Sequence, residues 1–187
     1  MTSTATSSTR FNDLAYGWLY SGAIGGSVIA LFFLGVDVTA GHPFFTPSLL
    51  GSVLFFDAEA ATYEGMNLTA VALFTIFHVG AFFVLGGIGS FLHQRLRENV
   101  GFTELPTGLT LLVLSEGGFL LAAATLLPGV AARLGHGLVL TGNTLAAVAM
   151  AAFLGWAYRQ RPANVAGGEA AGGQGSKQAD SRSPSGS

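Results

Sequence analysis

The stretch LTAVALFTIFHVGAFFVLGGIGSFL, residues 68–92, decides the fold of this chain. It contains no Asp, Glu, Lys or Arg, and its one strongly polar residue is His78. An α-helix needs about 20 predominantly apolar residues to cross the hydrocarbon core of a bilayer. The stretch is long enough for that, so we predict a transmembrane helix over residues 68–92.

Three more apolar runs of similar length flank this segment, and they predict spans at about 14–36, 106–130 and 138–158. Half of the 187 residues are hydrophobic and only 10% are charged, whereas soluble domains carry about 25% charged residues. Short connections make neighbouring helices antiparallel. The predicted fold class is therefore an all-α membrane protein, an antiparallel four-transmembrane-helix bundle.

The loop between the first two spans, residues 37–67, contains Asp and Glu but no Lys or Arg. Within it lies HPFFTPSLLGSVLFF, residues 42–56, whose apolar part is too short to span a bilayer. Pro47 after Thr46 is typical of a helix start. We predict a short interfacial helix here that covers the external end of the bundle.

The two ends of the chain differ in composition from the membrane domain, residues 14–161. Residues 1–13 are polar and rich in Ser and Thr, and residues 162–187 are dominated by Gly, Ser, Ala and Gln. Neither segment has an apolar face to bury, so both are predicted to be disordered.

The basic residues orient the four spans. Under this arrangement all but one of them fall on one side of the membrane, namely Arg10, Arg95, Arg97, Arg159, Arg161, Lys177 and Arg182. Only Arg133 falls on the other side. Lys and Arg are enriched in cytoplasmic loops, so both termini are predicted to be cytoplasmic.

Charge and cysteine content exclude several classes of function. The net charge is −2, which provides no basic surface for nucleic acid. The chain has no cysteine, which excludes disulfides, thiolate metal sites, iron–sulfur clusters and thiol nucleophiles.

Small residues on the first and fourth spans predict close helix packing. Gly22 and Gly26 form a GxxxG pair, and Ala147, Ala151 and Gly155 follow one another at four-residue intervals. In lipid, such residues allow helix backbones to approach closely.

Three polar residues in the spans are the candidate site: His78, Glu116 and Asn143. A carboxylate near the bilayer centre costs at least ~2.5–3.5 kcal/mol on insertion scales. At 1.5 Å per residue, His78 and Glu116 both lie ~15 Å into a ~30 Å core. We therefore expect these two side chains to meet at the midplane, with Asn143 nearer the external face.

Three interpretations of this pair remain open. In the first, His78 donates a hydrogen bond to Glu116 and ties two helices together without binding a cofactor. In the second, His78 is an axial ligand to a tetrapyrrole, either haem or chlorophyll. Bis-His haem is not expected, since no second histidine lies inside a span. In the third, both residues form a proton relay or a quinone site. No cofactor is the first expectation.

A metal site at the external rim is a further hypothesis. His42 and His136 lie there, together with the acidic residues Asp57, Glu59 and Glu64. Their spacing matches no metal-binding motif. A solvated acidic loop is the favoured interpretation, so no metal is predicted.

The run HPFFTPSLLGSVLF resembles a segment in a group of small uncharacterised bacterial membrane proteins. Those proteins share a four-helix layout, a His in the second span, here His78, and an acidic residue in the third, here Glu116. The resemblance covers about residues 14–160. It implies this fold and a bacterial inner (cytoplasmic) membrane, and it implies no activity.

These observations favour a non-catalytic accessory subunit of a larger respiratory or photosynthetic membrane complex. Its partners would be the lipid bilayer and other membrane subunits, because many apolar residues are left to face other helices or lipid. The alternative is a tetrapyrrole-, quinone- or proton-handling site at His78 and Glu116. A small transporter or channel comes third, since nothing resembles an inverted repeat with broken helices.

Overall fold

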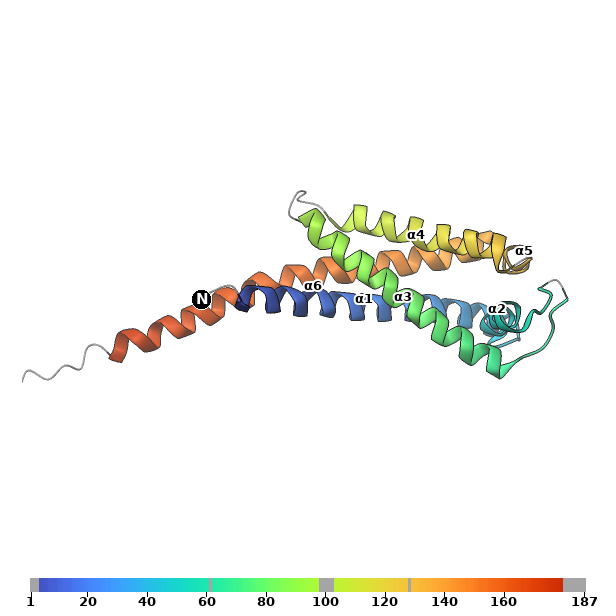
Figure 1. Ribbon diagram of the computed structural model, residues 1–187, viewed down its shortest axis with the longest axis horizontal. Helices are drawn as coiled ribbons and strands as arrows, with labels where there is room; N and C mark the ends of the chain where they lie inside the picture. Colours follow the sequence, from blue (N-terminus) through green and yellow to red (C-terminus); the bar gives the residue numbers. More distant parts are fainter. Residues whose placement is uncertain (1–3, 61, 98–102, 128, 180–187) are drawn as a thin grey trace, which may run out of the picture.

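The computed structural model describes residues 4–60, 62–97, 103–127 and 129–179, and all regular elements in these residues are helices. Figure 1 shows their arrangement along one long axis. The elements are α1 (Thr4–Thr39), α2 (Phe45–Phe56), α3 (Leu68–Arg97), α4 (Glu104–Thr125), α5 (Val130–Leu134) and α6 (His136–Ala179).

Four of these helices are long and apolar enough to cross a membrane. The qualifying segments are Ala15–Thr39, Leu68–Arg97, Glu104–Thr125 and His136–Gln160. Each begins or ends within a few residues of a span expected from the sequence. The chain is therefore a multi-pass membrane protein by length and composition of its helices.

Helices α1 and α3 cross at a contact of backbone against backbone. A Cβ atom added at Gly86 would lie 2.5 Å from the carbonyl oxygen of Trp18 and 2.7 Å from the amide nitrogen of Gly22. A Cβ at Gly22 would lie 2.7 Å from the carbonyl oxygen of Phe82. Only glycine fits at this crossing, which Figure 1 shows near the middle of both helices.

Helix α6 packs between α1 and α4 through its small residues. Ala147 and Ala151 are buried, and a Cβ at Gly108 of α4 would lie 3.3 Å from the Cβ of Ala151. Gly155 faces the side chain of Glu104, and Gly26 of α1 lies against Phe82 of α3. The glycine pair of α1 therefore packs against α3, and the small residues of α6 pack against α4.

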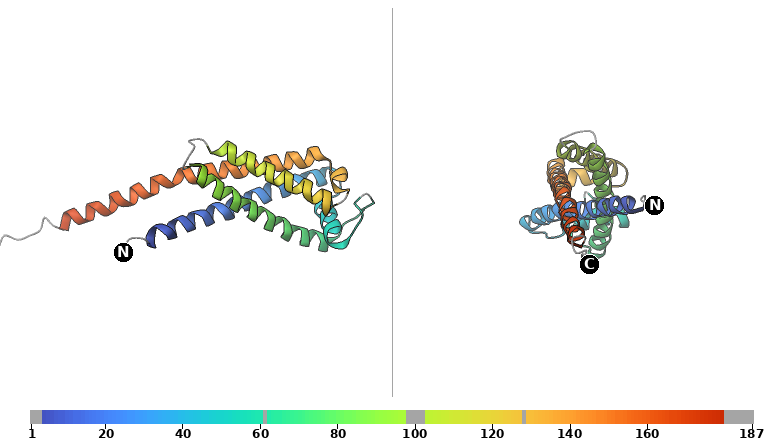
Figure 2. Two further views of the ribbon diagram at one scale, coloured as in Figure 1. Left: turned by 45° about the horizontal axis from the view of Figure 1, so that its top comes forward. Right: turned by 90° about the vertical axis from the view of Figure 1, so that its left-hand side faces the viewer.

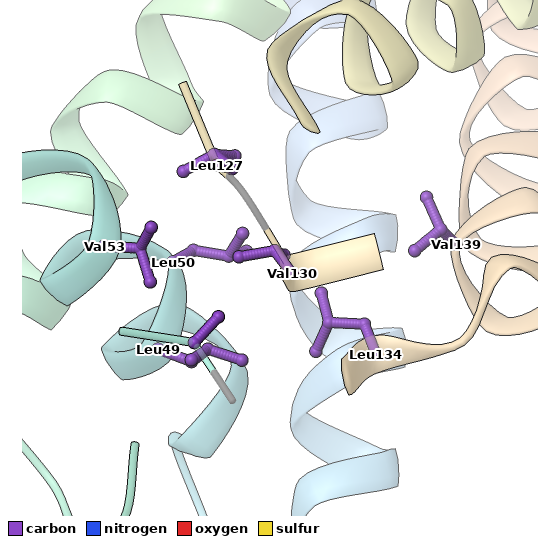
Figure 3. Close-up of a cluster of buried hydrophobic side chains, with 8 residues drawn as sticks. Leu49, Leu50, Val53, Leu127, Val130, Leu134 and Val139 are labelled. Carbon is purple, nitrogen blue, oxygen red and sulfur yellow. The ribbon is translucent and has the colours of Figure 1, made fainter. Parts of the chain in front are cut away.

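Helix α2 covers the end of the molecule where α5 lies. Its side chains Leu49, Leu50 and Val53 belong to a buried cluster with residues of the α4–α6 connection, drawn in Figure 3. At Gly51 the α2 backbone also meets the backbone of Ala70 in α3, so closely that a side chain would not fit. The short helix was expected from residues 42–56, and it is present; α5 was not expected.

The third long helix ends earlier than the sequence suggested. A span was predicted to about residue 130, whereas α4 ends at Thr125 and a new helix begins after Gly129, whose φ is 79°. Pro128 disfavours helical backbone at the preceding residue, and the positive φ of Gly129 reverses the chain.

Two helices extend into segments for which disorder was expected. Helix α1 begins at Thr4, and α6 continues to Ala179, beyond the apolar run that ends near residue 158. Both extensions lie at the same end of the molecule, as Figures 1 and 2 show. The expected disorder of residues 1–3 and 180–187 falls outside the described residues.

Candidate functional site

A cavity of about 660 Å³ lies among α1, α3, α4 and α6, and residues of α2 line one end of it. Ligand-binding cavities commonly measure ≈ 300–1,000 Å³. Most of the lining is apolar, and the polar residues that face it are Asp37, Thr46, Thr75, His78, Ser115 and Asn143. An apolar cavity with a few polar groups is the usual form of a small-molecule site.

The cavity exists because α3 diverges from α4. The two helices touch where Gly89 lies against Leu111 and where His93 contacts Thr103 and Thr107. From there α3 runs toward α2 and away from α4, as Figures 1 and 2 show. The glycine crossing with α1 and the contact with α2 set the course of α3, so the space between α3 and α4 is left open.

His78 lines the cavity and bonds to α1. Its Nε2 lies 3.2 Å from the carbonyl oxygen of Gly26. Its ring contacts Phe74 and Phe82, with centroids at 5.8 and 4.8 Å. A carbonyl only accepts hydrogen bonds, so Nε2 carries the hydrogen and Nδ1 of the neutral ring carries a lone pair.

This geometry disfavours the tetrapyrrole hypothesis. Nε2, the ring nitrogen farthest from the backbone, is occupied by Gly26. Nδ1 lies next to Cβ, and the Phe74 and Phe82 rings lie beside the imidazole. The metal ion of a macrocycle would have to bind the nitrogen nearer the backbone or break the bond to Gly26.

The expected hydrogen bond between His78 and Glu116 is not formed. Instead, Asn143 Nδ2 donates to Glu116 Oε2 at 2.8 Å. Helix α4 packs mainly on α6, while α3 packs mainly on α1. Glu116 therefore bonds to a residue of α6. The pairing with His78 was expected because both residues lie at a similar distance along their predicted spans, but that distance does not determine which helices are neighbours.

Asp37 organises the end of the cavity that α2 lines. It is only 4% exposed, and its two carboxylate oxygens accept hydrogen bonds from the amide and the hydroxyl of Thr46, each at 2.7 Å. Asp37 thus satisfies an amide in the first turn of α2. The sequence predicted a loop from residue 37 onward, so the burial of Asp37 was not expected; its position directly after the apolar run was the available signal.

A second polar cluster lies at the opposite end of the molecule. His93 is 1% exposed, and its Nδ1 and Nε2 lie 3.3 Å from the hydroxyls of Thr107 and Thr103. The Thr107 hydroxyl donates to the Thr103 carbonyl, so it accepts from His93 Nδ1. The His93 ring stacks on Tyr158, centroid to centroid 5.2 Å.

Tyr158 links this cluster to the basic residues of the same end. Its hydroxyl lies 2.9 Å from Ser90 Oγ and accepts from Gln94 Nε2 at 2.6 Å. Arg97 donates to the Tyr158 carbonyl at 2.6 Å, and Arg159 lies 3.4 Å from Glu104. This cluster was not expected from the sequence, because Tyr158 is far from His93, Thr103 and Thr107 along the chain.

The rim histidines do not form a metal centre with their neighbours. His42 lines a separate pocket with Glu64 and Arg133, and His136 is not part of that lining. Over the described part of the chain, no three His, Asp or Glu side chains gather closely enough to hold a metal ion.

Comparison with known proteins gives no relative for this chain: no protein-family model, no curated protein and no solved structure matches it. The function is therefore argued from the geometry above.

Proposed function

We propose that this protein is a bacterial inner-membrane protein that binds a lipophilic small molecule in the cavity beside His78. The observation that carries the proposal is the cavity itself, about 660 Å³ in volume and apolar, with the Nδ1 lone pair of His78 unused by any described residue. A quinone or another isoprenoid lipid belongs to the class of ligand that such a site suits.

The lining supports entry of the ligand from the bilayer. Residues of α3 and α4 face the cavity from both sides, including Ala81 and Leu85 of α3 and Gly118 and Ala122 of α4. These residues lie within the spans. A hydrophobic molecule dissolved in the membrane would reach the site between the two helices without crossing water.

Gly118 and Gly117 provide a matched pair of variants to test the proposal. A Cβ at either position would meet nothing within 4 Å, so the two positions are equally open to the first atom of a new side chain. Gly118 lines the cavity and Gly117 does not. Gly118→Leu should therefore place a side chain in the cavity and reduce the space for a ligand, while Gly117→Leu should leave the cavity unchanged.

The measurement is mass spectrometry of the lipophilic compounds that co-purify with the full chain in a mild detergent. We expect one compound to be enriched in near-stoichiometric amount with wild type and with Gly117→Leu, and at least ten-fold depleted with Gly118→Leu. Identical profiles for all three proteins would contradict the proposed function.

We also propose an antiparallel bundle whose termini are cytoplasmic and whose α2 helix lies at the external interface. Two observations support this orientation. Arg97 and Arg159 lie at one end, in contact with Tyr158 and Glu104, whereas Arg133 lies at the end of α2, over the Phe45 ring. Arginine at the cytoplasmic boundary is what the positive-inside rule favours.

The accessory-subunit hypothesis stays a prediction and is compatible with a ligand site. Large apolar side chains such as Ile76, Val113 and Leu121 are about two-thirds exposed or more. They suit lipid and the helices of another subunit equally well. Purification with quantitative mass spectrometry of protein partners tests this role; recovery of the chain alone would contradict it.

A further inference from the structure

Most of the polar side chains that line the cavity already use their hydrogens in hydrogen bonds to other parts of the protein. His78 donates through Nε2 to Gly26, which leaves Nδ1 as an acceptor. No described residue donates to that nitrogen. His78 lines the cavity, and Nδ1 is its ring atom with acceptor capacity left for a bound molecule.

The hydroxyl groups of the residues that line the cavity also donate their hydrogens to other groups of the protein. Thr75 donates to the Val71 carbonyl at 2.7 Å and Ser115 donates to the Leu112 carbonyl at 3.1 Å. The Thr46 hydroxyl donates to Asp37. A hydroxyl has one hydrogen and two lone pairs, so each of these oxygens has only acceptor capacity left.

Asn143 completes the set. Its Nδ2 donates to Glu116, and its Oδ1 accepts no hydrogen bond from the described residues. One amide hydrogen of Asn143 remains, and it is the single donor left among the polar side chains that line the cavity. The lining is therefore rich in acceptors and poor in donors.

We propose that the cavity selects a lipophilic molecule whose polar end is a hydroxyl, and that Nδ1 of His78 accepts the hydrogen of that hydroxyl. This inference rests on the proposed function and narrows it. A ligand hydroxyl supplies the hydrogen that the lining lacks, whereas a carbonyl or an ether would bring lone pairs against lone pairs. Of a quinone and its reduced quinol, the quinol is the ligand that fits.

Two probes with the same nonylphenyl body separate these chemistries: 4-nonylphenol, which has a hydroxyl, and 4-nonylanisole, in which a methyl group replaces the hydroxyl hydrogen. Binding of each to the full chain in lipid nanodiscs is measured by equilibrium dialysis, with Gly118→Leu as the baseline for non-specific partitioning. We expect the phenol to bind at least ten-fold more tightly, which corresponds to about 1.4 kcal/mol.

Two substitutions at His78 separate its ligand role from its structural role. The amide of Gln reaches the position of Nε2, so His78→Gln keeps a donor toward Gly26 and loses the acceptor at the Nδ1 position. The carbonyl of Asn occupies the Nδ1 position, so His78→Asn keeps the acceptor and loses the bond to Gly26. We expect the preference for the phenol to vanish in His78→Gln and to persist in His78→Asn.

The outcomes distinguish this inference from the proposed function. Equal binding of both probes to wild type, or an unchanged preference in His78→Gln, overturns the inference and leaves a lipophilic-ligand site in place. Binding of neither probe above the Gly118→Leu baseline overturns both. A preference lost in His78→Gln and kept in His78→Asn supports the assignment.

Discussion

His93 illustrates how a buried histidine can be fully bonded without a cofactor. Its two ring nitrogens face the hydroxyls of Thr107 and Thr103, which lie one helical turn apart. Since Thr107 donates to the Thr103 carbonyl, it receives the Nδ1 hydrogen and fixes the tautomer. His93 is therefore a structural residue, in contrast to His78, which lines a cavity and whose Nδ1 has no partner among the described residues.

This arrangement predicts that Thr107→Val destabilises the protein. The substitution keeps the volume but leaves the Nδ1 hydrogen of His93 buried without an acceptor, at a cost of about 1–3 kcal/mol. The measurement is the free energy of unfolding in mixed detergent micelles.

Thr110→Val is the matched control, because Thr110 lies one turn further along α4 and bonds only to the Pro106 carbonyl of its own helix. Its effect is expected to stay within about 0.5 kcal/mol. Equal losses in both variants would contradict the role assigned to His93.

Glu116 shows what the sequence could and could not tell at the scale of one residue. That it needs a partner followed from the cost of a carboxylate in the bilayer. The identity of the partner did not follow, because residues at the same depth are numerous and the choice depends on which helices are neighbours. Asn143 was named as a candidate, but it was placed too near the external face to be paired with Glu116.

At the scale of the element, the four long helices and the short helix of the first loop were predictable, because apolar length and proline position are local properties. The ends were less predictable: α4 stops at Thr125 and α5 follows. The pairing of α1 with α3 was also out of reach. Gly22 was a candidate packing residue, but nothing local to the first span identifies Gly86 as its counterpart.

The crossing of α1 and α3 predicts a large effect of one added methyl group. In Gly86→Ala the new Cβ would meet the backbone of Trp18 and Gly22, and backbone cannot move aside as a flexible side chain does. We expect a loss of about 1–3 kcal/mol in the free energy of unfolding.

Gly80→Ala on the same helix is the control, since a Cβ there meets nothing within 4 Å. It should be neutral or stabilising by up to about 1 kcal/mol, because Ala favours helix over Gly. If both variants unfold alike, the close approach at Gly86 does not hold the helices together.

At the scale of the whole molecule, the proposed orientation predicts which ends of the helices face the cytoplasm. The chain has no cysteine, so single cysteines report position without background. Glu64→Cys lies at the α2 end and Gln160→Cys at the end of the fourth span, and both side chains are exposed.

A membrane-impermeant maleimide applied to intact cells should label Glu64→Cys and should label Gln160→Cys only after permeabilisation. The reverse pattern would show the opposite orientation. Labelling of both cysteines in intact cells would contradict the three spans that separate the two positions, because an odd number of spans places them on opposite sides of the membrane.

The cavity is the feature of the whole molecule that could not be predicted from the sequence. Its polar lining comes from five helices, and no two of these residues form a motif. It results from the divergence of α3 and α4, which depends on contacts that α3 makes with α1 and α2. Such a space is a property of the assembled fold, so local patterns indicated His78 and Asn143 but not the volume between them.

The hydrogen bond between Asn143 and Glu116 also has a consequence for biosynthesis. The two residues are 27 positions apart in the chain, so the carboxyl group of α4 is translated well before its partner. Released into the bilayer alone, α4 would carry that group at a cost of at least ~2.5–3.5 kcal/mol. We therefore expect helices α4 and α6 to leave the insertion machinery together, as one helical hairpin.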